Sequence, residues 1–374
     1  MYDPFKRSRT NARKRMQRAT KTAFGKLLTG TLPATAPAKR KAAKTTTPLA
    51  KMVTPKGKAR PAASPRPKPA PKPPSTARAR TTRPRGASFR SGLHRCEFGE
   101  RAFKLYIPAV AKQSEGALPL VVMLHGCSQS PDDFARGTGM NVLAEEFGFL
   151  VLYPAQERKT QMFRCWSWYK RSDQTRGAGE PALLASLVRD VIARQGADLS
   201  RVYIAGLSAG ASAALIVADA YPDIFAAVGA HSGLPVGAAH DEATAVVAMQ
   251  HGAPGLRHIV PMPTICFHGS ADRVVNPRNG RFIAMRALDP YSDLRKTEKT
   301  GHVPGGRTYV RTSHRIGRGR SFAEHWVVEG AGHAWSGGNA AGSFTDPTGP
   351  DASREMVRFF LRHRTTAKKR ASIG

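Results

Sequence analysis

A serine between two glycines, in the segment IAGLSAG at residues 204–210, has the residue types of a nucleophile elbow. A strand-like run precedes Ser208 and a run of small residues follows it, as expected for a sharp turn from a strand into a helix. Gly206 and Gly210 would let the backbone make this turn and leave the serine oxygen exposed. The sequence therefore predicts that Ser208 is a catalytic nucleophile and not an ordinary turn residue.

A serine hydroxyl is a weak nucleophile at neutral pH and needs a histidine base that is oriented by a carboxylate. When a serine sits on such an elbow, the acid and then the histidine follow it along the chain. Asp272, in CFHGSADRVV, and His333, in GAGHAWSGG, each follow a strand-like run and are the predicted acid and base. The competing residues are Asp241, Asp289, Asp293, Asp346, His302, His314 and His325. The competing acids lack a preceding buried strand, and the last two histidines fall inside strand-like runs.

Acyl transfer to a serine also needs backbone N–H groups that stabilise the oxyanion. Ala209 is the residue after the nucleophile, and Cys127, in LHGCSQ, follows an early apolar strand. These two positions are the predicted oxyanion hole. Cys127 is not itself a predicted nucleophile, because Ser208 has the complete set of partners. Its thiol is either buried and free or bridged to Cys165.

Several aromatic residues lie close to these motifs in the sequence. Trp166, Trp168 and Tyr169 occur in CWSWYK, and Trp335 lies two residues after His333. Such side chains either line an apolar acyl-binding cleft or pack in the core. Both interpretations stay open for Trp166 and Trp168, whereas the position of Trp335 favours the cleft.

The segments between these motifs alternate between strand-like and helix-like runs over residues 89–364. Continuous apolar runs typical of buried parallel strands occur at 118–126 and 149–154, and a further strand-like run occurs at 200–206. Helix-like runs occur at 140–148, 180–196, 209–222 and 350–364. Residues 101–108 alternate like a strand at an edge or with one exposed face. The order predicts an α/β fold with a mostly parallel sheet covered by helices on both faces.

The chain has 374 residues and a formal net charge of +33, and most of that charge lies at the N-terminus. Residues 1–88 contain 24 lysines and arginines and one acid, Asp3. This tail is rich in Ala, Pro, Lys and Arg, so it cannot bury enough apolar surface to fold and is predicted to be disordered. Residues 5–28 leave open a short amphipathic helix, and 365–374 form a basic C-terminal tail. The catalytic domain is predicted over 89–364.

The sequence also limits location and cofactors. No stretch is long and apolar enough to span a membrane. The basic N-terminus has no apolar segment of the kind found in secretion signals, which favours a cytoplasmic or granule-associated protein. The four cysteines match no zinc-binding spacing. We expect no metal and no organic cofactor.

Eight motifs together resemble the poly(3-hydroxybutyrate) depolymerase family of esterases. In chain order they are LHGCSQ, LVLYPAQ, CWSWY, RGAGEPA, GLSAGAS, YPDIFAAVGAHSG, HGSADRVV and GAGHAWSGG. The resemblance covers about residues 95–362 and implies an α/β-hydrolase fold. One departure is Ala211, where the family often has glycine. No second folded region resembles a polymer-binding domain, and the same catalytic module is similar to feruloyl and acetylxylan esterases.

The resemblance assigns the same roles to the residues that match its motifs. Ser208 would be the nucleophile, Asp272 the acid, His333 the base and Cys127 the oxyanion-loop position. The expected reaction is hydrolysis of short 3-hydroxyalkanoate esters, or of the polyester, through an acyl-enzyme. The alternatives are a feruloyl or acetylxylan esterase, and a nucleic-acid-associated or granule-associated protein with a secondary hydrolase domain. Secreted members of the family make an extracellular location the alternative.

The basic tail suggests a second class of partner besides the ester substrate. Dense lysines and arginines attract phosphates and other anions without sequence preference. We expect the tail to associate with an anionic surface, namely a polyester granule, nucleic acid or a membrane.

Overall fold

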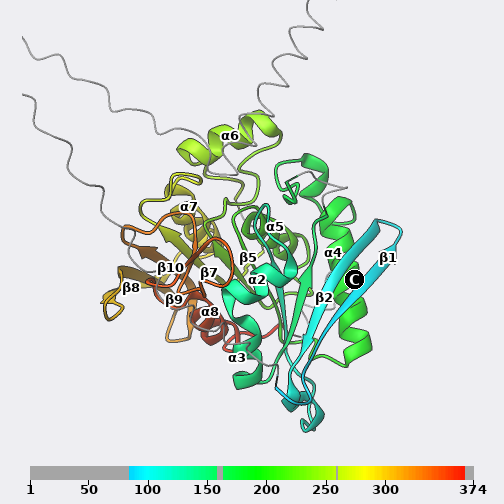
Figure 1. The fold of residues 1–374 in the computed structure, drawn as a ribbon. Coiled ribbons are helices and arrows are strands. Elements are labelled where there is room, and N and C mark those ends of the chain that lie inside the picture. The colour runs from blue at the N-terminus through cyan, green and yellow to red at the C-terminus, as the bar shows by residue number, and fades with distance from the viewer. Residues whose placement is uncertain (1–83, 158–162, 258–259, 367–374) are drawn as a thin grey trace, which may run out of the picture. The chain divides into compact units, whose positions relative to one another are not determined.

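The computed structural model describes residues 84–157, 163–257 and 260–366 (Figure 1). The predicted basic tail lies outside the described residues except at its end, where Ser88 already begins the first strand. The helix predicted within 5–28 and most of the predicted C-terminal tail also lie outside them. Thr365 is described, and its backbone N–H donates to the carbonyl of Ser200 over 2.9 Å. The folded domain therefore extends slightly beyond the predicted 89–364 at both ends.

One large sheet dominates the described residues. Its ten strands are ordered β1-β2-β4-β3-β5-β6-β7-β10-β9-β8. Their bounds are β1 Ser88–Cys96, β2 Gly99–Ile107, β3 Leu120–Leu124, β4 Leu150–Pro154, β5 Val202–Leu207, β6 Ala227–His231, β7 Thr264–Gly269, β8 Leu294–His302, β9 Thr308–Ile316 and β10 Ser321–Val328. The six central strands run parallel to one another, in the order β4-β3-β5-β6-β7-β10. On one side β2 and β1, and on the other side β9 and β8, are added by antiparallel pairing. The mostly parallel sheet is as predicted.

The edges of the sheet differ in detail from the prediction. The strand at 101–108 is β2, which is covered on its outer side by β1 in an antiparallel hairpin that pairs Ser88 with Ile107. At the other edge, β8 and β9 form a second hairpin. Apolar patterning gives little sign of β8, because almost all of its residues are exposed and many are charged.

Helices cover both faces of the sheet, as the alternating order predicts. Their bounds are α2 Pro131–Thr138, α3 Met140–Phe147, α4 Gly179–Gln195, α5 Ala209–Ala220, α6 Glu242–His251, α7 Arg278–Leu288 and α8 Ala352–Phe360, with short 3-10 turns η1 Ala109–Lys112 and η2 Arg171–Asp173. Helices α4, α5, α6 and α7 contribute to one apolar cluster. Helices α2, α3 and α8 contribute to the other. The sheet therefore lies between two separate halves of the core.

The central strands end at one edge of the sheet, and their loops carry the predicted site residues. Four of these central strands are buried along their whole length, namely β3, β5, β6 and β7. Cys127 follows β3, Ser208 follows β5, Asp272 follows β7 and His333 follows β10. Because parallel strands present their carboxyl ends at the same edge, these residues meet there. A short sheet of β11 Trp335–Ser336 and β12 Thr345–Asp346 lies in the loop after His333.

A search of the helices in the described residues finds none long and apolar enough to cross a membrane.

Candidate active site

Ser208 lies in the turn between β5 and α5, and its backbone has a conformation that non-glycine residues rarely adopt. Its φ is 57° and its ψ is −122°. Such conformations persist where surrounding contacts hold them, and they are frequent at functional sites. One of these contacts is the hydrogen bond from the Ser208 N–H to the carbonyl of His231, at 2.8 Å. The structure thus places Ser208 at the strand-to-helix turn that the sequence predicts.

The turn has no room for a side chain at Gly206 or Gly210. A Cβ on Gly206 would overlap the backbone of Gly210 and approach the carbonyl oxygen of Leu124. A Cβ on Gly210 would overlap the carbonyl oxygens of Leu124 and His125. The serine turn therefore packs directly against the end of β3, and a side chain at either glycine would push the two apart.

Asp272 accepts hydrogen bonds from three donors and lies close to a second histidine. Its Oδ1 accepts hydrogen bonds from the backbone N–H groups of Val274 and Val275, both at 2.9 Å. Its Oδ2 accepts from Nδ1 of His333 at 2.7 Å and lies 3.4 Å from Nε2 of His268. Burial alone would raise the pKa of Asp272, but the charge of His333 and the hydrogen bonds from both histidines hold that pKa well below its usual value. Asp272 is therefore ionised at neutral pH.

His333 lies in the loop after β10, and its orientation is set by Asp272. Its side chain is only 10% exposed. Because Nδ1 donates to the carboxylate, Nε2 is the nitrogen that can accept a proton. No hydrogen bond joins Ser208 to His333 within the part of the chain that the structure describes. Catalytic hydrogen bonds are often long or poorly aligned until substrate binds. The structure thus brings Asp272 and His333 into contact and connects them to Ser208 indirectly, through the end of β6.

His231, the last residue of β6, makes that connection. Its carbonyl accepts from the Ser208 N–H, and its ring Nε2 accepts from the backbone N–H of Ser336 at 3.0 Å, three residues after His333. The ring also stacks between Phe267 and Trp335, with centroids 5.8 and 5.2 Å away. Burial, followed by the charges of nearby histidines, lowers the pKa of His231 to about 3. The ring is therefore neutral and can accept from Ser336.

The predicted oxyanion residues lie on either side of the serine turn. Ala209 is the first residue of α5, so its N–H has no acceptor within the helix. Cys127 lies two residues after His125, whose carbonyl oxygen is close to Gly210. The hydrogen bonds of the described residues include none donated by the N–H of Cys127. Within the described residues, neither N–H group thus has a hydrogen-bond acceptor, as the predicted role requires.

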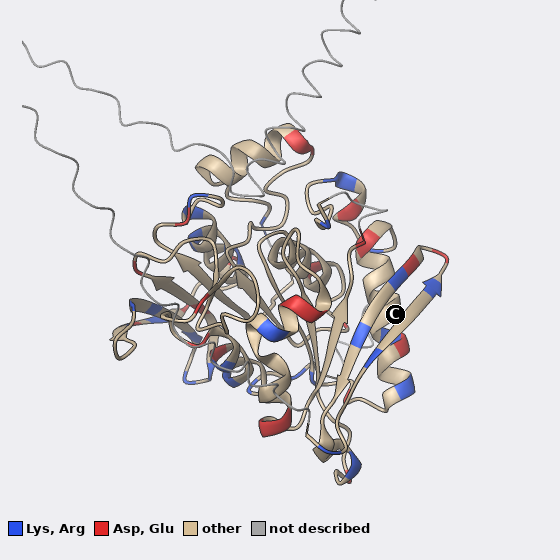
Figure 2. Ribbon diagram, in the orientation of Figure 1, with Lys and Arg blue, Asp and Glu red and all other residues tan. Residues whose placement is uncertain are grey.

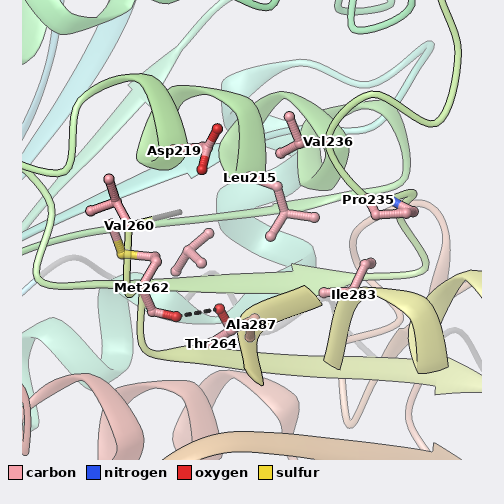
Figure 3. A pocket seen from close by; sticks show the side chains of 10 residues that line it. Leu215, Asp219, Pro235, Val236, Val260, Met262, Thr264, Ile283 and Ala287 are labelled. Atoms are coloured by element: carbon pink, nitrogen blue, oxygen red, sulfur yellow. Dashed lines mark hydrogen bonds between the residues drawn. The ribbon is translucent and has the colours of Figure 1, made fainter. Parts of the chain in front are cut away.

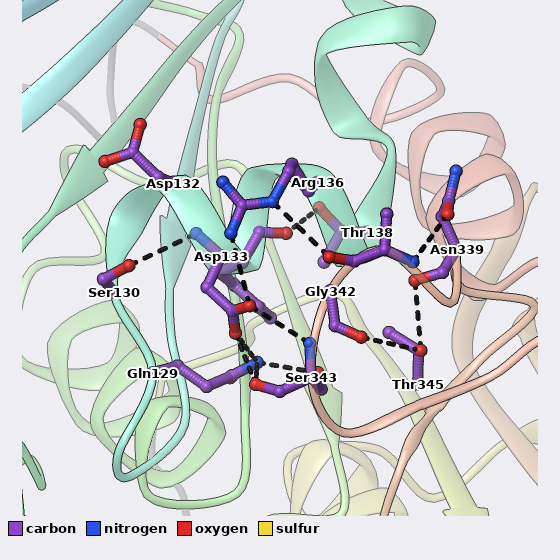
Figure 4. Close-up of polar contacts among 12 residues, drawn as sticks. Gln129, Ser130, Asp132, Asp133, Arg136, Thr138, Asn339, Gly342, Ser343 and Thr345 are labelled. Atoms are coloured by element: carbon purple, nitrogen blue, oxygen red, sulfur yellow. Dashed lines mark hydrogen bonds and ion pairs between the residues drawn. The ribbon is translucent and has the colours of Figure 1, made fainter. Parts of the chain in front are cut away.

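The loop that carries Cys127 is fastened to two other segments. Gln129 Oε1 accepts from the Gly126 N–H at 2.9 Å, and Gln129 Nε2 donates to Asp133 Oδ2 at 3.1 Å and to the Ser343 carbonyl at 2.9 Å. The Ser343 N–H in turn donates to Asp133 Oδ1 at 3.1 Å. Figure 4 shows these contacts joining the start of α2 to the segment before β12. The oxyanion loop and the loop after His333 are therefore held together.

The structure resolves the two alternatives for the Cys127 thiol. Cys127 and Cys165 form a disulfide, with Cα atoms 4.4 Å apart. The bridge ties the oxyanion loop to the segment that carries Trp166. The other cysteines are free: Cys266 is buried and Cys96 is partly exposed.

The tryptophans do not line an open cleft, and for Trp335 this corrects the prediction. Trp335 is 1% exposed, donates from Nε1 to Ser353 Oγ at 3.0 Å and packs edge-on against Phe134. Trp166 and Trp168 are equally buried, and Trp166 donates to the His125 carbonyl at 2.8 Å. All three indoles are core residues. Trp335 lies in the loop after His333, and Trp166 follows Cys165, which is bridged to Cys127, so both pack next to segments that carry predicted site residues.

The competing residues have other contacts. Asp241 caps the N-terminus of α6, Asp289 pairs with Arg286, and Asp346 pairs with Arg307. The competing histidines lie within strands β8, β9 and β10. Among the described residues, no group of three or more histidine, cysteine or carboxylate side chains is arranged to hold a metal ion.

A small apolar pocket lies apart from these groups, between α5 and α7 (Figure 3). Its lining residues are Leu215, Asp219, Val228, Pro235, Val236, Val260, Met262, Thr264, Ile283 and Ala287. The free space within it is about 10 Å³, roughly enough for one water molecule. None of the predicted site residues lines it, so it is not the place where an ester would meet Ser208.

Sequence patterns did not indicate three of the residues that organise the site. His231 and His268 lie at or beside the carboxyl ends of buried strands, and Gln129 follows the end of β3. A polar residue at the end of an otherwise apolar strand is the signal that could have found the two histidines. Gln129 has no such signal, because its partners are distant in the chain.

The comparison with protein families agrees with this geometry. The family described as "Esterase PHB depolymerase" matches residues 101–293, which is more than half of the chain. The chain belongs to this family. The matched range contains Ser208 and Asp272 and ends before His333, so the histidine is supported by its contact with Asp272 and not by the family match.

Individual relatives of this PHB depolymerase-family esterase differ in their substrates. Poly(3-hydroxyalkanoate) depolymerase C of Paucimonas lemoignei is 30% identical over 229 residues, which cover 58% of this chain and 54% of that protein. Feruloyl esterase B of Neurospora crassa is 31% identical over 237 residues, which cover 57% of this chain and 77% of that protein. The chain therefore spans about half the length of the first of these relatives.

A solved structure establishes the fold. The acetyl xylan esterase from Aspergillus awamori superimposes with a TM-score of 0.54 at 21% identity, covering 66% of this chain and 94% of that one. The chain thus has the α/β-hydrolase fold that the motifs imply.

Proposed function

We propose that this chain is a serine carboxylic-ester hydrolase in which Ser208 is the nucleophile, His333 the base and Asp272 the acid. The observation that carries the proposal is the 2.7 Å hydrogen bond between His333 Nδ1 and Asp272 Oδ2. It lies at the sheet edge where Ser208 occupies its strained turn. A histidine oriented by a carboxylate, at the same sheet edge as a serine on a strand-to-helix turn, is the arrangement that acyl transfer requires.

The first half of the reaction forms an acyl-enzyme. His333 Nε2 takes the proton of Ser208 Oγ while the oxygen attacks the ester carbonyl carbon. The resulting oxyanion accepts hydrogen bonds from the N–H groups of Cys127 and Ala209. When the tetrahedral intermediate collapses, the protonated His333 gives its proton to the departing alkoxide, and the alcohol leaves. The ionised Asp272 stabilises the imidazolium between these two transfers.

The second half releases the acid. His333 Nε2 takes a proton from a water molecule, whose oxygen attacks the acyl carbon. A second oxyanion forms in the same site, and its collapse returns Ser208 to the neutral alcohol. The proton that His333 received goes to Ser208 Oγ, so the enzyme is restored. No step in this sequence requires a metal or an organic cofactor.

For the substrate, we propose short 3-hydroxyalkanoate esters or their polyester. The support is the relation to the Paucimonas lemoignei depolymerase together with the eight motifs. The second candidate is a feruloyl or acetylxylan ester, supported by the relations to the feruloyl esterase of Neurospora crassa and to acetylxylan esterase A of Emericella nidulans. The two candidates differ in the acyl group that must fit beside Ser208.

A hydrolysis panel on the full chain tests both candidates. The panel contains p-nitrophenyl esters of increasing acyl length, hydroxybutyrate oligomers, amorphous polyester granules and methyl ferulate. We expect turnover of the short esters and oligomers, and its loss in Ser208→Ala. Turnover of methyl ferulate alone would move the assignment to the second candidate, and turnover that survives Ser208→Ala would contradict the mechanism.

We further propose that the chain associates with an anionic surface, such as a polyester granule or nucleic acid, inside the cell. The sequence supports this with the charge of residues 1–88. The folded domain adds like-charge pairs across the β8–β9 hairpin, where exposed Arg295 is opposite exposed Arg315 and exposed Lys299 is opposite half-buried Arg311. Figure 2 shows lysines and arginines, in blue, in the region of this hairpin. Such pairs repel each other and are relieved by a bound anion.

Co-sedimentation with granules and binding to DNA, each at low and high salt, test this association. We expect the full chain to bind at low salt and to be released at high salt. Binding that does not change with salt, or no binding at low salt, would contradict an electrostatic attachment.

A further inference from the structure

His268 is a buried histidine beside the proposed acid that the mechanism above does not use. It lies in β7, four residues before Asp272, and its side chain is 1% exposed. Its Nε2 lies 2.9 Å from the Val275 carbonyl oxygen and 3.4 Å from Asp272 Oδ2. A carbonyl and an ionised carboxylate are both acceptors, so Nε2 must carry a proton. That N–H donates to the Val275 carbonyl, and the Asp272 carboxylate is its second and more distant neighbour.

The other ring nitrogen of His268, Nδ1, has no hydrogen-bond partner among the described residues. If the ring is neutral, a proton on Nε2 leaves a lone pair on Nδ1. Nδ1 of His268 and Nε2 of His325, on the neighbouring strand β10, are both buried without a hydrogen-bond partner among the described residues. A Cβ on Gly280 would lie 2.9 Å from the first and 3.0 Å from the second. Both nitrogens therefore lie beside Gly280 at the start of α7.

The surrounding groups keep this part of the core uncharged. Burial is the main cause that lowers the pKa of His325 to about 4, and the neighbouring His268, His314 and Arg281 act in the same direction. Burial raises the pKa of the Cys266 thiol, which contacts the Gly280 carbonyl. At neutral pH both groups are uncharged. Of the groups facing His268, Asp272 is the anion in direct contact with it.

We propose that His268 is a positioning residue for the Asp272–His333 pair. Its Nε2–H lies 3.4 Å from Asp272 Oδ2, the same oxygen that accepts from His333, and is a second, longer polar contact to that oxygen. The two backbone N–H groups hold Oδ1, and the two histidines hold Oδ2, so the plane of the carboxylate is fixed toward His333. The second donor also reduces the negative charge that Oδ2 presents to the imidazolium. The proposal rests on the function proposed above.

Removal of this donor has two expected effects. A carboxylate with one donor fewer is less well oriented, and we expect kcat to fall about ten-fold with KM nearly unchanged. The same carboxylate stabilises protonated His333 more strongly. The acid limb of the kcat/KM profile should therefore move to higher pH, by about 0.5 to 1 unit.

Three substitutions in the full chain test the proposal. His268→Met fills the site without a donor, whereas His268→Gln keeps an N–H near the position of Nε2. His363→Met is the matched control, because His363 is also buried and bonded to a carbonyl, that of Ser321, but contacts none of the proposed site residues. We expect His268→Met to show both effects, His268→Gln to restore both, and His363→Met to leave the pH profile unchanged. If His268→Met does not fold, His268→Asn replaces it, because its shorter amide does not reach Asp272.

The outcomes separate this proposal from the proposed function. A folded donor-free variant with the kcat and pH profile of the wild type would overturn it, and so would a loss that His268→Gln does not restore. If the wild-type chain hydrolyses no ester, the proposed function fails. The titration of the His333 ring, followed by NMR of histidine-labelled protein, then still decides the proposal, because it needs no turnover. A titration that is the same in wild type and His268→Met would refute it.

Discussion

The disulfide between Cys127 and Cys165 gives a prediction whose magnitude follows from the chain. The two cysteines are 38 residues apart. Closing a loop of that length reduces the entropy of the unfolded chain enough to stabilise the fold by about 4 kcal/mol on the loop-entropy model. We therefore expect the double substitution Cys127→Ala/Cys165→Ala to lower the free energy of unfolding by about 4 kcal/mol. Turnover should fall as well, because the bridge holds the loop that supplies the Cys127 N–H.

Urea unfolding and a count of thiols check this prediction. The single substitution Cys96→Ala is the control, because Cys96 is a free and partly exposed thiol, and its removal should change stability little. The unfolded wild-type chain should show two reactive thiols before reduction and four after it, since the chain has four cysteines. Four reactive thiols without reduction, or a double variant as stable as the control, would refute the reasoning.

Three further predictions concern the site and the core. Gly210→Ala should destabilise the fold by about 1–3 kcal/mol, because its Cβ would overlap two carbonyl oxygens. Gly116→Ala is the control and should change stability little, because nothing lies within 4 Å of a Cβ there. Chemical unfolding of both variants measures the difference. Asp272→Asn should lower kcat by orders of magnitude, whereas Asp346→Asn should not. A larger loss of kcat in Asp346→Asn than in Asp272→Asn, measured by steady-state assays, would assign the acid to Asp346. Stability should fall as the pH falls from about 6.5 toward 4, because the unfolded chain then binds protons that the native state excludes, with a slope of up to about 1.4 kcal/mol per pH unit for each buried histidine. Urea midpoints that do not change over this range would contradict that assignment. The histidines whose pKa burial lowers to about 3 or 4 are His125, His231, His325 and His363.

The places of the proposed reacting groups in the fold could be predicted because Ser208 and Asp272 each have a strong local signal. Ser208 stands between two glycines at the junction of a strand and a helix, and Asp272 follows an apolar strand. The sheet order then brings the ends of β5 and β7 to one edge. The elements between them follow from apolar patterning and from the glycines that end α3 and α4, Gly148 and Gly196, which both have positive φ.

Features that depend on contacts between distant segments could not be predicted. The burial of Trp335 depends on Phe134 and Ser353, which come from other parts of the chain. The support of the oxyanion loop by Ser343 spans 214 residues. The β8–β9 hairpin is held at the edge of the sheet by pairing with β10, and its own charged residues give little apolar pattern.

The central claim is that Ser208 is the nucleophile, activated by His333. Labelling of the full chain with a fluorophosphonate, followed by peptide mass spectrometry, tests it most directly, because the reagent traps a serine that is activated for attack. We predict one equivalent of label on Ser208, none on Ser208→Ala, and much slower labelling of His333→Ala. Label on a different residue, or an unlabelled chain that still hydrolyses esters, would contradict the account.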